Sequence, residues 1–138
     1  MTFPGAPCIY YGDEVGLGGG LDPDCRRSFP SESDWNMSLL QSHKALIQLR
    51  HSLPALRTGA YKTVLAEGTL YGFIRQTEDQ TILILVNSGQ TEASGIVSTE
   101  WFSTDSWTIQ YGEGQCNHET THLRVTLPPL NGVVIKDD

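Results

Sequence analysis

The chain has 138 residues, enough for one ordinary domain and too few for two large ones. Hydrophobic residues make up 38% and charged residues 18%, a composition that supports a buried core and argues against a disordered chain. The net charge is −7, and residues 61–138 carry ten acidic but only four basic side chains. With no basic patch to neutralise phosphates, and no apolar run near the roughly 20 residues that span a bilayer, neither nucleic acid nor a membrane is expected as a partner.

Three cysteines, Cys8, Cys25 and Cys116, lie far apart in the sequence. Disulfide-stapled domains and zinc sites need more or closer cysteines, so we expect free thiols and a cytoplasmic setting. The first residues have neither a charged start nor an apolar signal core. A signal for export, if one existed, would therefore lie upstream.

Residues 7–12 (PCIYYG) form a short apolar run that predicts a buried strand of the parallel type. A glycine-rich loop is expected from Asp13 to about Met37, and loops of this length are usually functional or disordered. Residues 38–53 predict a helix, because leucines recur every seven residues and Pro54 ends the pattern. Both Asn36 and Ser38 are candidate caps for this helix.

From Tyr61 onward the apolar pattern alternates with a period of two, which predicts strands. The run 81–86 (TILILV) is apolar on both faces and predicts a central strand. Seven short strands with regular turns favour an antiparallel sandwich. The expected strands are 61–66, 69–76, 80–87, 91–98, 106–111, 122–127 and 131–136.

These two parts do not form one ordinary fold. A strand, a loop and a helix make a single βα unit, which needs parallel neighbours that this chain does not supply. We therefore expect the chain to be a fragment of a larger protein.

Residues 3–14 (FPGAPCIYYGDE) and 19–27 (GGLDPDCRR) resemble the segment around the eighth barrel strand of the α-amylase family, glycoside hydrolase family thirteen. The version with Asp22-Pro23-Asp24-Cys25-Arg26 is most similar to neopullulanases, cyclomaltodextrinases and maltogenic amylases. Residues 46–61 resemble the last barrel helix of that family, and 127–135 resemble the last strand of its C-terminal domain. The resemblance is most specific over residues 3–27.

The resemblance implies a fold that is α/β plus all-β. Residues 1–58 would be the last strand, loop and helix of a TIM-type (β/α)8 barrel, and residues 59–138 a C-terminal β-sandwich domain. The remainder of the barrel is expected upstream, and the chain alone should self-associate through the exposed apolar face of its helix.

The resemblance also implies that the chain belongs to a retaining hydrolase of α-1,4 links in maltodextrin, cyclodextrin or pullulan. Asp22 and Arg26 match the residues that hold the sugar one position beyond the cleaved glucose on the non-reducing side. The alternative is a purely structural role, in which Asp22 caps a turn and Arg26 pairs with it at the surface. After Cys25 the close relatives often read RRPFPW, whereas this chain reads RRSFPS, so an aromatic is lost unless Trp35 replaces it.

Retaining glycosidases need two carboxyl groups about 5–5.5 Å apart, and the resemblance places the family's catalytic acids upstream of Met1. Asp13 and Glu14 are no substitute, because adjacent residues leaving a strand point to opposite faces. We therefore expect no catalytic residue, no cofactor and no hydrolysis by this chain alone, with an α-glucan oligosaccharide as the ligand. The alternative is a stand-alone carbohydrate-binding or structural sandwich module.

Two other patterns are weaker. Residues 118–122 (HETTH) fit the zinc-protease motif H-E-x-x-H, which works only on a helix, where both imidazoles share a face. Here two threonines and a following strand pattern favour a loop or strand, so no metal site is expected. The aromatics Trp101, Phe102, Trp107 and Tyr111 could stack on sugars, but such residues more often fill a sandwich core.

Overall fold

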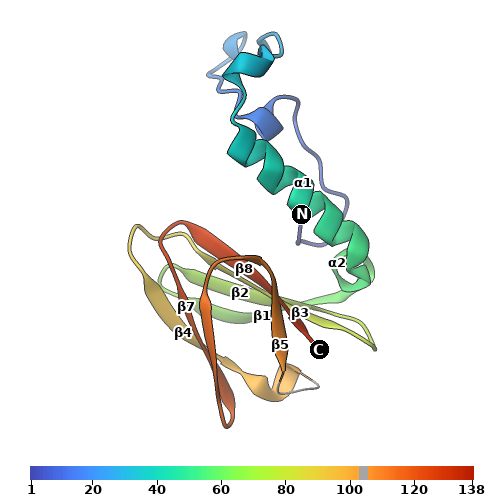
Figure 1. The fold of residues 1–138 in the computed structure, drawn as a ribbon, viewed down its shortest axis with the longest axis vertical. Coiled ribbons are helices and arrows are strands. Elements are labelled where there is room, and N and C mark those ends of the chain that lie inside the picture. Colours follow the sequence, from blue (N-terminus) through green and yellow to red (C-terminus); the bar gives the residue numbers. More distant parts are fainter. Residues whose placement is uncertain (103–105) are drawn as a thin grey trace.

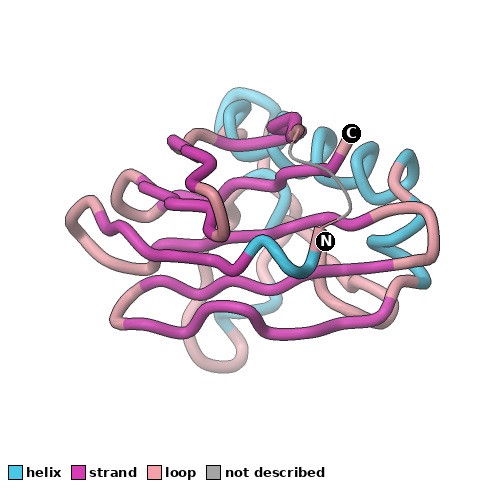
Figure 2. The backbone as a smooth tube through the Cα atoms, turned by 90° about the horizontal axis from the view of Figure 1, so that it is seen from below, coloured by secondary structure: helices cyan, strands magenta, loops and turns pink. Residues whose placement is uncertain are grey.

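In the part of the chain that the structure describes, eight strands pack as two antiparallel sheets, which confirms the predicted sandwich (Figures 1 and 2). The computed structural model describes residues 1–102 and 106–138. The larger sheet has the order β1-β2-β3-β8-β5, formed by Ala60–Glu67, Leu70–Gln76, Thr81–Asn87, Asn131–Asp137 and Trp107–Gly112. The smaller sheet has the order β4-β7-β6, formed by Ala93–Ser98, His122–Leu127 and Gln115–Glu119. Strand β6 was not predicted, whereas the other seven match the expected ranges within about two residues at either end.

The main core lies between the two sheets and is built by alternate residues of the facing strands. Burial of each such aliphatic side chain contributes about 1.5–3 kcal/mol. Strand β3 is central in the larger sheet and is buried from Thr81 to Leu85, as predicted from its continuous apolar run. The buried members of this core are Leu65, Leu70, Ile74, Leu83, Leu85, Val97, Leu123, Val125, Leu127, Val133 and Ile135.

A second cluster covers the outer face of the larger sheet and attaches the helices to it. Helix α1 spans Met37–Ser52, and the short helix α2 spans Pro54–Thr58. Leu53, Ala55 and Leu56 from this helical region pack on β2, β3 and β8, where the buried partners are Phe73, Ile82, Ile84 and Val134. Helix α1 then projects away from the sandwich as an arm (Figure 1).

Helix α1 agrees with the predicted helix to within one residue at each end. Asn36 is the cap: its Oδ1 accepts a hydrogen bond from the Leu39 amide at 3.0 Å. Arg50 is the one buried residue of the helix, and the aliphatic stripe is only half-buried. The helix thus keeps a partly open apolar face, as the sequence predicted. No helix within residues 1–102 and 106–138 is long and apolar enough to cross a membrane.

The predicted strand at residues 7–12 is not formed, and most of this segment is exposed. A parallel strand needs a hydrogen-bonded neighbour, and within the described part of the chain no strand lies in parallel beside it. The segment instead runs along α1 into the predicted long loop. That loop contains three 3₁₀ turns, η1 (Asp13–Val15), η2 (Asp24–Arg26) and η3 (Glu32–Asp34), and a fourth, η4 (Thr99–Trp101), follows β4.

Candidate sugar-binding loop

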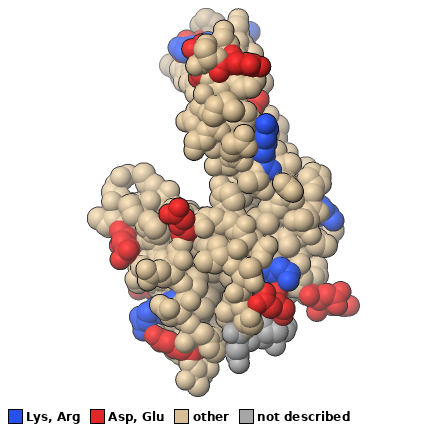
Figure 3. Space-filling view, in the orientation of Figure 1, with Lys and Arg blue, Asp and Glu red and all other residues tan. Residues whose placement is uncertain are grey.

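The structure brings Asp22 and Arg26 together at the tip of the arm. Turn η2 folds residues 24–26 back, so that Arg26 Nε donates to Asp22 Oδ1 at 2.7 Å. Both side chains are about two-thirds exposed, 67% for Asp22 and 64% for Arg26. Figure 3 shows acidic and basic side chains gathered at this end of the molecule.

A neighbouring ion pair holds the loop in shape. Arg27 Nε donates to Asp24 Oδ1 at 2.6 Å, and the Gly20 amide donates to Asp24 Oδ2 at 2.8 Å. The bond from Arg27, followed by the bond from Gly20, lowers the pKa of Asp24 below its usual value. Tyr11 ties the loop to the preceding segment, because its hydroxyl donates to the Arg27 carbonyl at 2.8 Å.

The Asp22–Arg26 pair itself has spare hydrogen-bonding capacity. Among the described residues, neither Asp22 Oδ2 nor the Nη groups of Arg26 have a hydrogen-bond partner. A carboxylate that accepts and a guanidinium that donates in fixed directions, side by side, suit the hydroxyls of a sugar ring. An exposed pair of this kind adds at most about 1 kcal/mol to stability, so the fold does not depend on it. An ordinary surface ion pair would have the same geometry.

Asp13 and Glu14 lie in η1 and do not leave a strand, so the expected alternation of their side chains does not apply. Glu14 Oε2 accepts a hydrogen bond from the Gly12 amide at 2.9 Å and so closes the turn. Gly12 needs its positive φ of 90°, and a Cβ there would lie 2.7 Å from the Leu17 side chain. This pair thus shapes the entrance to the loop.

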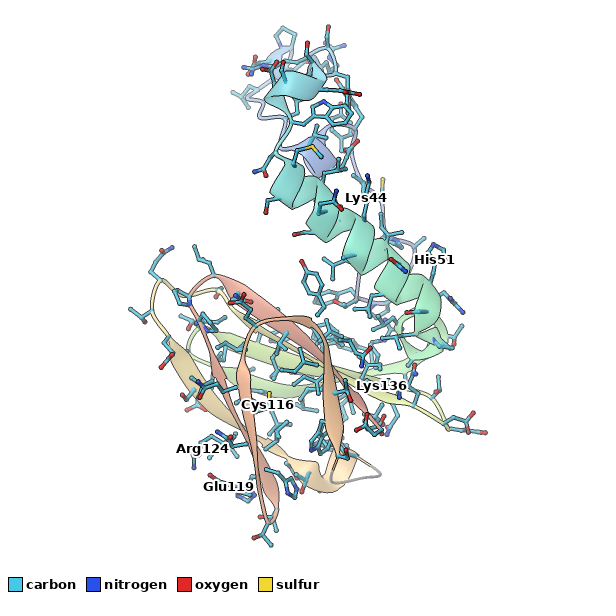
Figure 4. All side chains as sticks on the ribbon, viewed as in Figure 1. Lys44, His51, Cys116, Glu119, Arg124 and Lys136 are labelled. Atoms are coloured by element: carbon cyan, nitrogen blue, oxygen red, sulfur yellow. The ribbon has the colours of Figure 1, made fainter. Side chains whose placement is uncertain are left out.

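The H-E-x-x-H pattern falls on the β6–β7 hairpin and not on a helix, as predicted. Glu119 pairs with His122 and His118 pairs with Leu123, so the two imidazoles lie on opposite faces of the hairpin. Glu119 accepts from Arg124 Nε at 2.8 Å, and Figure 4 shows the two side chains directed toward one another. Across residues 1–102 and 106–138, no three side chains of the metal-ligating types cluster together.

The aromatic side chains of the sandwich cover its core. Trp101, Phe102 and Trp107 pack against the main cluster, and the rings of Phe102 and Trp107 meet edge to face at 4.1 Å. Tyr111 packs on the second cluster. Within the loop, Trp35 is half-buried and donates its indole N–H to the Pro30 carbonyl at 3.0 Å, so it is held by its own segment.

Two buried arginines that the sequence analysis did not single out lie at the base of the arm. Arg50 Nη1 and Arg75 Nη1 both donate to the Leu56 carbonyl, at 2.7 and 2.9 Å. The two guanidinium groups also donate to further carbonyl oxygens, Arg50 to those of Met1, Phe3 and Gly5 and Arg75 to those of Thr2 and Gly59. The signal in the sequence was Arg75 itself, which shares a strand face with Tyr71 and Phe73 in an otherwise apolar alternation.

Individual proteins match the chain over nearly its whole length, although no family model matches it. Neopullulanase 2 of Thermoactinomyces vulgaris is 32% identical over 98% of the chain, which spans 24% of that protein. A cyclomaltodextrinase of a Bacillus species is 41% identical over 91 residues, 64% of the chain and 16% of that enzyme. Among solved structures, the debranching enzyme of Nostoc punctiforme superposes with a TM-score of 0.88 at 43% identity, covering 97% of this chain and 28% of that one.

These matches agree on one assignment. Neopullulanase 2 and the debranching enzyme match 98% and 97% of the chain, so their similarity includes both the arm and the sandwich. The chain spans about a quarter of the length of these two relatives. The chain belongs to the α-amylase family of glycoside hydrolases, in which it corresponds to the C-terminal portion of the larger enzymes.

Proposed function

We propose that these residues serve a retaining hydrolase of α-1,4-glucosidic links, with maltodextrin, cyclodextrin or pullulan as the class of substrate. In this proposal residues 1–58 complete a TIM-type barrel and residues 59–138 form its C-terminal domain. The observation that carries it is the Asp22–Arg26 pair, exposed at the tip of the arm with an acceptor and donors still available. Asp22 would accept hydrogen bonds from sugar hydroxyls, and Arg26 would donate to a neighbouring oxygen.

The catalytic acids would come from the remainder of the barrel. A retaining mechanism needs two carboxyl groups about 5–5.5 Å apart, a nucleophile and an acid/base. Glu14 is engaged with the Gly12 amide, and Asp24 is engaged with Arg27 and Gly20, so these loop carboxylates have structural partners. The chain would thus supply substrate contacts and no hydrolytic group.

The open side of the arm supports a large partner. Two hollows of about 420 and 380 Å³ lie between the N-terminal segment and α1, lined by Met1, Pro7 and Ile9 in both cases. The exposed segment 7–11 lacks the neighbours that a parallel strand would need. Both features favour the remaining barrel units as the partner, and in their absence the same surface should make the chain associate with itself.

A stand-alone sugar-binding sandwich is less well supported. Such modules present exposed aromatic rings, whereas Trp101, Phe102 and Trp107 lie against the core and Lys62 Nζ sits 3.5 Å from the centre of the Trp101 ring. The cytoplasmic setting inferred from the cysteines remains part of the proposal.

A chimera tests the proposal. This chain would replace the matching part of the Nostoc punctiforme debranching enzyme, and hydrolysis of maltotriose and β-cyclodextrin would be measured. Loss of a hydrogen bond to a charged group removes about 1.5–3 kcal/mol, so Asp22→Asn should lower kcat/KM roughly 10- to 150-fold. Arg26→Lys keeps the positive charge but loses the planar fork of donors, and it should also lower kcat/KM.

The matched control is Arg124→Lys, which alters a surface ion pair of similar length on the sandwich. It should leave kcat/KM unchanged. An active chimera in which Asp22→Asn has no more effect than Arg124→Lys would rule out the sugar-contact role.

A further inference from the structure

The base of the arm is fixed to the sandwich by two guanidinium groups. We call Arg50 and Arg75, with the carbonyl groups that they bind, the arginine clamp. Arg50 lies on α1 and donates to the carbonyls of Met1, Phe3 and Gly5, at 2.6, 3.2 and 2.5 Å. Arg75 lies on β2 and donates to Thr2 at 2.8 Å and to Gly59 at 2.9 Å. Together they join the N-terminal segment, α1, α2 and the larger sheet.

The clamp holds the start of the N-terminal segment, residues 1–9, which is weakly attached along the rest of its length. Among the described residues, no hydrogen bond joins residues 6–9 to α1, and hollows separate parts of the two. The segment is next secured at the other end of the helix, where the Asn36 amide donates to the Val15 carbonyl at 3.0 Å. These two anchor points are separated by a helix of 16 residues, about 24 Å. The loop with Asp22 and Arg26 lies beyond the second point.

The clamp buries two positively charged groups that have backbone carbonyls as partners, which is unusual for an arrangement that only adds stability. Arg75 is 1% exposed and Arg50 is 9% exposed, and among the described residues their hydrogen-bond partners are carbonyl oxygens, with no carboxylate. Burial, and then the nearby charge of Arg50, lowers the pKa of Arg75. Apolar residues often replace buried ionic groups at no loss of stability, whereas buried charged groups can fix one arrangement of the chain.

An aromatic contact marks the same junction. The Phe3 ring lies 4.7 Å from that of Phe73 on β2 and 5.9 Å from that of Tyr61 on β1. Phe3 therefore provides contact area between the N-terminal segment and the larger sheet. The directional hydrogen bonds of Arg75 fix the position of that segment along the sheet. A lysine could not replace Arg75, since a single ammonium cannot bridge the carbonyls of Thr2, Leu56 and Gly59 as a planar fork does.

We propose that Arg75 is a positioning residue: through the clamp, the sandwich sets the orientation of the arm and of the loop that carries Asp22 and Arg26. The sugar role of that loop rests on the proposed function, but the positioning itself can be measured without sugar. The C-terminal sandwich would thus act on the substrate site from a distance, through the first five residues.

Distances between paired spin labels test this. One label is placed on the exposed Cys8 or Cys25, with the other of the two changed to serine and Cys116 changed to alanine. The second label is placed on the sandwich at Glu92→Cys, an exposed position after β3. The unaltered clamp should give one narrow distance distribution for each pair.

In Arg75→Met and Arg75→Lys, both distance distributions should broaden or shift in protein that circular dichroism shows to be folded. The control is Arg57→Met, because Arg57 donates to carbonyls of α1 and makes no bond to the N-terminal segment. Unchanged distributions in a folded Arg75 variant would overturn the proposal, and so would a change at Cys8 that does not extend to Cys25. If the Arg75 variants change both distances but Asp22→Asn leaves kcat/KM of the chimera unchanged, the positioning role of the clamp stands and the sugar-contact role is rejected.

Discussion

The side-chain amide of Asn87 donates to the Leu127 carbonyl at 3.2 Å and so joins the end of β3 in one sheet to the end of β7 in the other. The same Nδ2 donates to the carbonyls of Thr91 and Pro128, and Oδ1 accepts from the Gly89 amide at 2.9 Å. Asn87 is 1% exposed. One buried polar side chain therefore organises two loops at this end of the sandwich.

Asn87→Ala should lower the free energy of unfolding by about 2–4 kcal/mol, because it leaves several buried backbone groups without partners. Urea unfolding followed by tryptophan fluorescence measures the change. Val86→Ala, at the adjacent exposed position, serves as the control and should cost less than about 1 kcal/mol. Equal effects of the two substitutions would mean that the Asn87 bonds do not matter for stability.

Asn36→Ala should destabilise α1 by about 1 kcal/mol, since it removes the bond to the Leu39 amide. Ser38→Ala is the matched comparison, because Ser38 lies inside the helix and does not cap it. Helical circular dichroism during thermal unfolding distinguishes them. A larger loss with Ser38→Ala would contradict the assigned cap.

The Glu119–Arg124 pair predicts a contribution to stability that depends on pH. The hydrogen bond from Arg124 lowers the pKa of Glu119 in the folded protein. A carboxyl group whose pKa is lowered on folding stabilises the protein above its unfolded pKa, and this stabilisation is lost as pH falls through the folded value. The gap in urea midpoint between the wild type and Glu119→Gln should therefore close as pH falls from 6 to 3. A gap that stays constant over this range would contradict the pairing.

The cysteines should differ in reactivity. Burial raises the pKa of the Cys116 thiol to about 11, whereas Cys8 and Cys25 are exposed. Since the thiolate is the reactive form, iodoacetamide at pH 8 should modify Cys8 and Cys25 first and Cys116 only after unfolding. Peptide mass spectrometry with time reads this order directly. Early modification of Cys116 in the folded protein would contradict its burial.

Periodicity predicted the elements whose own residues determine them. The leucine repeat of α1, the period-two pattern of β2 and β8 and the continuous apolar run of β3 gave their positions within a residue or two. Strand β6 was missed because its sequence, QCNHE, is almost entirely polar, and it forms only by pairing with β7. The reverse holds at residues 7–12, where the sequence favours a strand but the described chain offers no neighbour for it.

The candidate site was also predicted only in part. The spacing of Asp22 and Arg26 allowed them to meet across a short turn, and the structure has them in contact. The clamp was not predicted, because in a sequence a buried arginine looks the same as a surface one. Arg50 lies in the last turn of α1, where a basic side chain is common, yet its guanidinium reaches carbonyls almost fifty residues earlier in the chain. Only tertiary structure shows such long-range backbone partners.

Hydrolysis of β-cyclodextrin and maltotriose by the purified 138-residue chain tests the central claim most directly. We predict no turnover above background at any enzyme concentration, because in the proposed function Asp22 and Arg26 only contact the substrate and the catalytic acids lie in the rest of the barrel. Turnover by this chain would contradict the proposed function and would assign catalysis to carboxylates such as Glu14 and Asp24, which have structural partners in the loop.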